Sequence, residues 1–258
     1  MSIFISVLLL AAIAYFILRN KGTKTVLPET LQGSYISILT ERVGFYKKLD
    51  KEKQSLFEEL VLEFLGYVKI EGVGTGISDT DRVLVASSAI IPIFGFPGWK
   101  YKNLTNVILY PDTFDQDYQF EGENRSIMGM VGSGYMNGQM LLSRAALLRG
   151  FSKASGNENT AIHEFVHLLD KSDGATDGVP ENLLAHEYTV PWLKMMHGEM
   201  HRIEQGNSDI NPYALTNEAE FLAVASEYFF EKPEKMQERH PKLYELLTKI
   251  FGQDPGKS

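Results

Sequence analysis

The chain has 258 residues, of which 44% are hydrophobic and 22% charged, a composition typical of globular proteins that form one sizeable core. Its 25 Lys and Arg against 33 Asp and Glu give a formal net charge of −8, so its overall field repels phosphate backbones and nucleic acid is not an expected partner. The absence of cysteine excludes disulfides, thiol nucleophiles and Cys-ligated zinc. Any metal site must therefore use His, Asp and Glu.

The N-terminal segment from Ile3 to Leu18 contains no charged residue. As a helix it would span roughly 24 Å, less than the roughly 30 Å of a bilayer core, and Arg19 could snorkel to close the gap. Positive charge follows the apolar run and does not precede it, which argues against a cleaved signal peptide and favours a cytoplasmic domain. We therefore expect a single-pass anchor in the cell inner membrane over residues 1–18, with a buried or interfacial helix as the alternative.

The remainder of the chain is predicted to be a short linker followed by one α+β domain. Residues 19–34 are polar and include Gly22 and Pro28, as a linker would. Residues 35–258 show neither internal repeats nor a second boundary.

Apolar periodicity predicts the elements of this domain in chain order. Residues 51–65, preceded by Asp50, have the pattern of an amphipathic helix. Residues 79–94 carry a nearly continuous apolar run that fits a capped helix or a strand, and we favour the helix. Short apolar runs at residues 106–110 and 139–143 predict strands of a small sheet.

Two glycine-rich segments, residues 71–76 and 129–138, invite comparison with phosphate-binding loops. Neither ends in Gly-Lys-Ser/Thr, and neither has a clear strand-to-helix context. We therefore predict loops or hairpin turns at both places.

The main candidates for catalytic and metal-binding residues lie at residues 163–167, with the sequence HEFVH, inside a predicted helix over residues 157–170. On a helix His163 and His167 stand one turn apart on the same face, so both imidazoles can reach one tetrahedral ion. Glu164 lies about 100° around the helix from the first histidine, beside the open coordination position. This arrangement predicts a hydrolytic zinc site in which Glu164 is the general base.

Such a site needs a third protein ligand, and the residues leave several candidates open. Asp170 shares a face with both histidines, but its short side chain is better suited to accept a hydrogen bond from a ligand imidazole. Glu220 and Glu227 lie in residues 217–230, a predicted helix opened by Asn217. They are embedded among apolar residues, unlike a solvated acidic face, so we favour Glu220 or Glu227 over Asp170.

The remaining histidines do not complete a second motif. His186 lacks a second histidine four residues later, and His197 and His201 have helical spacing but are expected to be exposed. His240, which precedes Pro241, is expected at the surface.

Four segments together resemble the zinc-dependent peptidases related to the Mlc titration factor. They are NVILYPDTF, AIHEFVHLLD, DGATDGVP and NPYALTNEAEFLAVASEYFF, and the resemblance covers about residues 40–255. That family is similar to the catalytic domain of anthrax lethal factor, which implies a zincin-like α+β domain of the gluzincin type. The resemblance also implies aminopeptidase-like activity on small substrates, whereas the apolar N-terminal segment departs from the best-known soluble members.

The resemblance further implies roles for individual residues. It implies one zinc ion per chain with three protein ligands: His163, His167 and Glu220. Glu164 would be the base, and Tyr213 would lie over the site, where its hydroxyl could stabilise the tetrahedral oxyanion. Asp170 and Glu227 would hydrogen-bond to the ligand side chains.

We therefore predict a zinc metallopeptidase acting on a peptide or protein substrate. The substrate would lie antiparallel along a sheet edge, and residues 139–143 are the expected strand. The alternative, from a different class, is a membrane-tethered regulatory or partner-binding module in which the same fold performs little hydrolysis.

Overall fold

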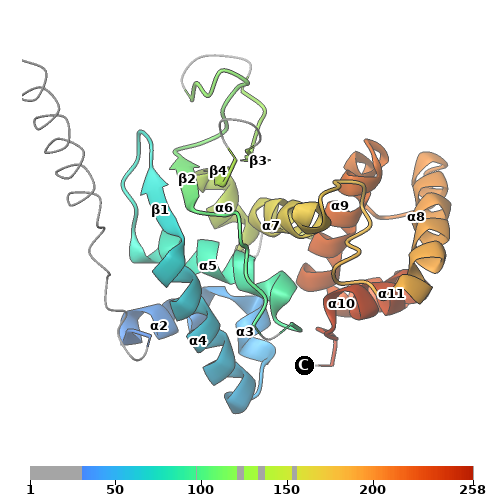
Figure 1. Cartoon of the computed structure of the whole chain (residues 1–258), viewed down its shortest axis with the longest axis horizontal. Helices are drawn as coiled ribbons and strands as arrows, with labels where there is room; N and C mark the ends of the chain where they lie inside the picture. Colours follow the sequence, from blue (N-terminus) through green and yellow to red (C-terminus); the bar gives the residue numbers. More distant parts are fainter. Residues whose placement is uncertain (1–30, 97, 121–124, 133–136, 153–155, 258) are drawn as a thin grey trace, which may run out of the picture.

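The computed structural model describes residues 31–96, 98–120, 125–132, 137–152 and 156–257. These ranges contain ten α-helices and a four-stranded mixed sheet (Figure 1). The predicted α+β class with a small mixed sheet is thereby confirmed.

The first elements in chain order are α2 (Gly33–Arg42), α3 (Gly44–Lys48), α4 (Lys51–Tyr67), β1 (Lys69–Gly72) and α5 (Asp79–Ile93). Next come β2 (Asn106–Tyr110), β3 (Gly129–Val131), β4 (Gln139–Ser143), α6 (Arg144–Gly150) and α7 (Thr160–Asp170). The last are η2 (Lys171–Asp173), η3 (His186–Tyr188), α8 (Thr189–Glu204), η4 (Pro212–Leu215), α9 (Glu218–Glu231), α10 (Pro233–Arg239) and α11 (Pro241–Phe251).

Two predicted helices of the N-terminal half form as expected. Helix α4 begins after Asp50, whose carboxylate accepts a hydrogen bond from the main-chain N–H of Lys53 at 2.9 Å. The apolar run after residue 78 forms helix α5 and not a strand, because Ser78 and Asp81 make a capping box at its start and Pro92 falls only in its last turn. Almost every residue of α5 is buried, and the helix packs against α4 and α7.

The sheet has the order β1-β2-β4-β3, with β1, β2 and β4 parallel and β3 antiparallel to β4. The predicted strands at residues 106–110 and 139–143 are confirmed. Strand β3 forms inside the second glycine-rich segment, so the prediction of a loop or turn there is wrong for residues 129–131. Because β4 lies between β2 and β3, it has no free edge, and it cannot receive a substrate strand as predicted. The edge strands are β1 and β3.

Helix α7 lies in the middle of the molecule, between the sheet and α9 (Figure 1), and contacts α5, α9 and β3. Its core face is fixed by aromatic packing. The ring of Phe165 lies 5.8 Å from that of Phe64 and 5.1 Å from that of Tyr101, measured between centroids. The opposite face of α7 is therefore held toward the sheet edge and α9.

The described part of the chain contains no helix that is both long enough and apolar enough to cross a membrane. Its longest helix, α4, has 17 residues and an exposed charged side, whereas a span needs about 20 mainly apolar residues. The predicted single-pass localisation in the inner membrane is therefore contradicted. The predicted anchor itself, residues 1–18, lies outside the described residues, as do residues 19–30 of the predicted linker.

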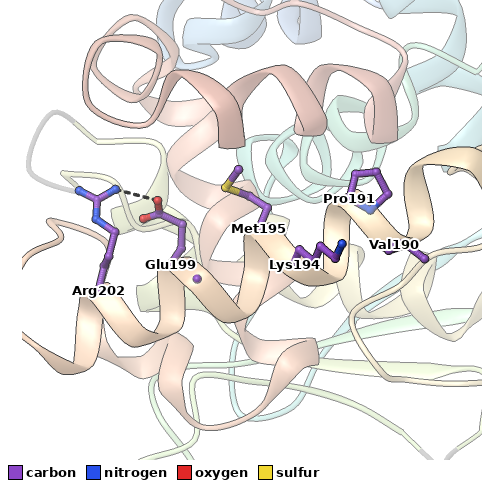
Figure 2. A pocket seen from close by; sticks show the side chains of 7 residues that line it. Val190, Pro191, Lys194, Met195, Glu199 and Arg202 are labelled. Atoms are coloured by element: carbon purple, nitrogen blue, oxygen red, sulfur yellow. Dashed lines mark hydrogen bonds and ion pairs between the residues drawn. The ribbon is translucent and has the colours of Figure 1, made fainter.

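His240 is buried and does not lie at the surface, contrary to the prediction, with only 3% of its area exposed. Its Nδ1 is 3.1 Å from Glu199 of α8 and its Nε2 is 2.8 Å from Asp209. Burial alone would lower the pKa of His240, but these two carboxylates raise it, so both ring nitrogens can carry protons and donate. Glu199 also pairs with Arg202 at 2.7 Å, beside a groove on the surface of α8 (Figure 2).

Replacement of His240 by Gln should lower the free energy of unfolding by about 1–3 kcal/mol, because two carboxylates lose the cation that they share, while Glu199 keeps Arg202 and Asp209 keeps Lys235. The folded pKa of His240 is raised, so its stabilising contribution is complete below its unfolded pKa of about 6.5 and is lost as the pH rises through the folded value. Urea unfolding between pH 5 and 9 measures both effects. His201→Gln, at an exposed histidine of α8, is the control, and equal destabilisation by the two substitutions would contradict the role of His240.

Candidate metal centre and its cleft

Helix α7, which carries both histidines, is capped at its N-terminus by Asn159. The side chain of Asn159 accepts a hydrogen bond from the main-chain N–H of Ile162 at 3.3 Å, so the predicted helix begins at Thr160. Ile162, Val166 and Leu169 on the other side of the helix are buried in the core. His163 and His167 consequently face the cleft side of the helix.

Helix α9 brings an acidic residue to the same place. The side chain of Asn217 accepts a hydrogen bond from the main-chain N–H of Glu220 at 2.9 Å, so the predicted cap is confirmed and Glu220 lies in the first turn. A carboxylate in the first turn is favoured by the helix dipole. Helix α9 packs along α7, which directs this carboxylate toward the two histidines.

Three ligand atoms converge on one point between these helices. His163 Nε2 lies 2.9 Å from Glu220 Oε2 and 3.1 Å from His167 Nε2, and His167 Nε2 lies 3.4 Å from the same carboxylate oxygen. Two imidazole nitrogens that face each other at this distance cannot both carry a proton. Within the described ranges, this is the one group of three or more His, Asp or Glu side chains able to hold a metal ion.

The outer nitrogen of His163 has its own acceptor. His163 Nδ1 lies 2.8 Å from Glu227 Oε1, and the other oxygen of Glu227 accepts the main-chain N–H of Asn159. Of the two glutamates left open by the sequence, Glu220 therefore faces both histidines, whereas Glu227 meets the far side of one. With Nδ1 as the donor, the lone pair of Nε2 points into the cluster.

Protons and carboxylates are strongly coupled in this cluster. Burial alone would lower the pKa of His163, but hydrogen bonds to Glu220 and Glu227 raise it to about 10. Burial would raise the pKa of Glu220, but its hydrogen bonds with His163 and His167 lower it to about 2. The three ligand atoms of the two histidines and Glu220 therefore hold a proton between them in this structure.

Asp170 lies outside the cluster of ligand atoms. It is fully buried, and its Oδ2 accepts the main-chain N–H of Gly178 at 2.9 Å, which ties the end of α7 to the following loop. Its Oδ1 and the Nδ1 of His167 are both buried without a hydrogen-bond partner among the described residues. Burial raises the pKa of Asp170 to about 6. The hydrogen bond predicted between Asp170 and a ligand imidazole is therefore not formed in this structure.

The two residues predicted to act on the substrate both line the same cleft. Glu164 is buried beside the cluster, and burial raises its pKa. Tyr213 stands on η4 with 54% of its area exposed, and its ring centroid is 6.1 Å from that of His163. Burial of the hydroxyl, together with Glu220 and Glu164, raises the pKa of Tyr213, so it stays protonated and able to donate.

The cleft has a volume of about 510 Å³ and is walled by β3, α7, the turn η4 and the start of α9. Its β3 wall, formed by Gly129, Met130 and Val131, was missed in the sequence, because three residues that include a glycine give no strand pattern. Lys171 also lines the cleft, and its Nζ donates a hydrogen bond to the carbonyl oxygen of Gly132 at 3.4 Å. The groove on α8 contains none of the predicted site residues (Figure 2).

Comparisons with known proteins found one matching family model and several relatives. A family model described as glucose-regulated metallo-peptidase M90 matches residues 18–252. An uncharacterized protein of Synechocystis sp. is 27% identical over 245 residues, which cover 90% of this chain and 88% of that relative. Mlc titration factor A of Cronobacter sakazakii is 32% identical over 162 residues, covering 58% of this chain and 59% of the relative. The protein of the same name from Klebsiella pneumoniae is 26% identical over 221 residues, covering 80% and 82% respectively.

Proposed function

Because the chain belongs to the glucose-regulated metallo-peptidase M90 family, we propose that it is a zinc-dependent peptidase whose ion is held by His163, His167 and Glu220. The observation that carries this proposal is the triangle of ligand atoms, with sides of 2.9, 3.1 and 3.4 Å. Two atoms bound to zinc at 2.0–2.1 Å with tetrahedral angles lie about 3.3 Å apart. Two histidines and one glutamate with a fourth position open are also the donor set of hydrolytic zinc enzymes.

The residues around the ligands have complementary roles in this proposal. Zinc, when bound, supplies a Lewis acid for water and for the scissile carbonyl. Glu164 takes the proton of the attacking water and passes it to the leaving amine, and its raised pKa suits both steps. The hydroxyl of Tyr213 donates a hydrogen bond to the developing oxyanion. Glu227 keeps His163 in the tautomer that leaves Nε2 free for the ion.

We propose that the peptide or protein substrate pairs with β3, since β4 has neighbours on both sides. Met128 and Gly132 hydrogen-bond to β4, and the two-residue repeat of antiparallel pairs assigns Met130 to the same side. The intervening Gly129 and Val131 then direct their main-chain N–H and C=O groups to the open edge. An extended peptide bound there would pass beside the proposed general base.

A second candidate function is that of a regulatory or partner-binding module with little hydrolysis. It is favoured by the name of several relatives, Mlc titration factor A, which refers to titration and not to hydrolysis. A zinc-loaded protein that cuts no peptide of a broad library would support this second function over the first.

Elemental analysis of the purified chain should find about one zinc per molecule. His163→Ala and Glu220→Ala should each remove most of it, because either substitution leaves only two protein ligands. Glu227→Gln should weaken zinc binding by about 10–100-fold, since it disturbs the orientation of His163. Asp170→Asn, a buried control outside the cluster, should keep the ion. Loss of zinc with Asp170→Asn but not with Glu220→Ala would overturn the ligand assignment.

Glu164→Gln should retain zinc yet lower kcat for peptide hydrolysis by about 10²–10⁴-fold, because glutamine cannot accept the proton of water. Assays on a library of fluorogenic peptides, with zinc content measured on the same samples, test this expectation. Turnover at the wild-type rate would exclude Glu164 as the base.

Tyr213→Phe should lower kcat by about 10²–10³-fold with a smaller change in KM, because the hydroxyl acts mainly on the transition state. Steady-state kinetics on one cleaved peptide separates the two parameters. Tyr118→Phe is the control, since Tyr118 is exposed and does not line the cleft. An unchanged kcat would remove Tyr213 from the mechanism.

A further inference from the structure

The carboxylate of Glu164 is held in place without hydrogen bonds from the described residues. Only 7% of the residue is exposed, and no hydrogen bond of the described residues involves its oxygens. The carboxylates of Glu220 and Glu227 differ in this respect, because each is fixed by a histidine. The position of Glu164 must therefore depend on packing.

The packing surface is the backbone of β3 at Gly129. A methyl group built on Gly129 would lie 2.6 Å from both Cγ and Oε1 of Glu164 and 2.8 Å from its Cδ. Carbon atoms in ordinary contact are about 3.5–4.0 Å apart. Gly129 is not among the glycines with a positive φ, so its backbone conformation does not require glycine. Its lack of a side chain is instead a requirement for space.

We propose that Gly129 is a positioning residue for Glu164, whose carboxylate rests directly on the edge strand. Strand β3 is fixed by its pairing with β4, whereas the carboxylate is the free end of a flexible side chain. A side chain at position 129 would therefore displace the carboxylate and not the strand. The catalytic consequence rests on the proposed peptidase function, but the packing relation does not.

This contact fixes the distance between the carboxylate of Glu164 and the open edge of β3. Gly129 offers its main-chain groups to the proposed substrate on one side and contacts Glu164 on another. The water that Glu164 would deprotonate is thereby aligned with a peptide held on β3. A displacement of about 1 Å at such a site costs about 10²-fold in rate.

The first test is Gly129→Ala in the full-length, zinc-loaded protein. We expect unchanged zinc content, a kcat lower by about 10²-fold and little change in KM, because only the base moves. Gly76→Ala is the matched control, since a methyl group there meets no atom within 4 Å, and it should leave kcat unchanged. Loss of zinc, or a purely KM effect, would contradict a role through Glu164.

The second test repeats Gly129→Ala in a Glu164→Ala background. If Gly129 acts through Glu164, the substitution no longer lowers the residual turnover there. Its effect on Tm should also reverse, from a decrease in the wild type to an increase of about 2 °C, because the methyl group fills vacated space and the entropic cost of glycine is removed. Equal changes in both backgrounds would show that Gly129 acts through the strand, and would overturn the proposal.

The Tm comparison separates this proposal from the peptidase function. If the wild type cuts no peptide but the effect on Tm reverses, the proposed hydrolysis fails while the packing of Glu164 on Gly129 stands. If peptides are cut and both effects are additive, the hydrolysis stands and the positioning role of Gly129 fails.

Discussion

The hydrogen bonds between the start of α7 and the last turns of α9 fix the geometry on which the candidate site depends. Asn159 caps α7 through its side-chain oxygen, donates its main-chain N–H to Glu227 and donates its side-chain amide to Glu231 at 2.8 Å. The far oxygen of Glu227 then meets His163. One residue thus sets the start of the histidine helix, its distance from the glutamate helix and, through Glu227, the orientation of an imidazole.

Because Glu220 and Glu227 both contact His163, protons and cations compete for its Nε2. The pKa of His163 is raised to about 10, since two carboxylates stabilise its charged form more than burial opposes it. A cation that binds Nε2 must displace that proton, so its apparent affinity falls as the pH decreases. The carboxylates that orient the ligands also concentrate negative charge around them, which favours a divalent ion over a single proton once the pH permits.

Local patterns predicted the parts of the site that are encoded within one helix. The spacing of His163 and His167 and the cap at Asn217 follow from short-range rules of helix formation. The choice between Glu220 and Glu227 does not follow from such rules, because both lie on one face of α9. Only the packing of α9 on α7 places Glu220 against both histidines and Glu227 against the outer nitrogen of His163. Strand β3 escaped prediction for a similar reason, since a three-residue strand is specified by its pairing partner and not by its own sequence.

The burial of His240 also depends on residues that are distant in the sequence. Its two acceptors lie 41 and 31 residues away in the sequence, so neighbouring residues alone suggested an exposed position. Apolar periodicity likewise identified the helix over residues 79–94, but only its nearly complete burial distinguishes a central core helix from an amphipathic one.

The shortness of β3 has a consequence for association with other chains. Long unpaired edges invite pairing between identical molecules and lead to aggregation, and natural proteins limit this by keeping such edges short. Among the described residues, β3 leaves the outward main-chain groups of Gly129 and Val131 without a strand partner, too few to hold two copies together in a continuous sheet.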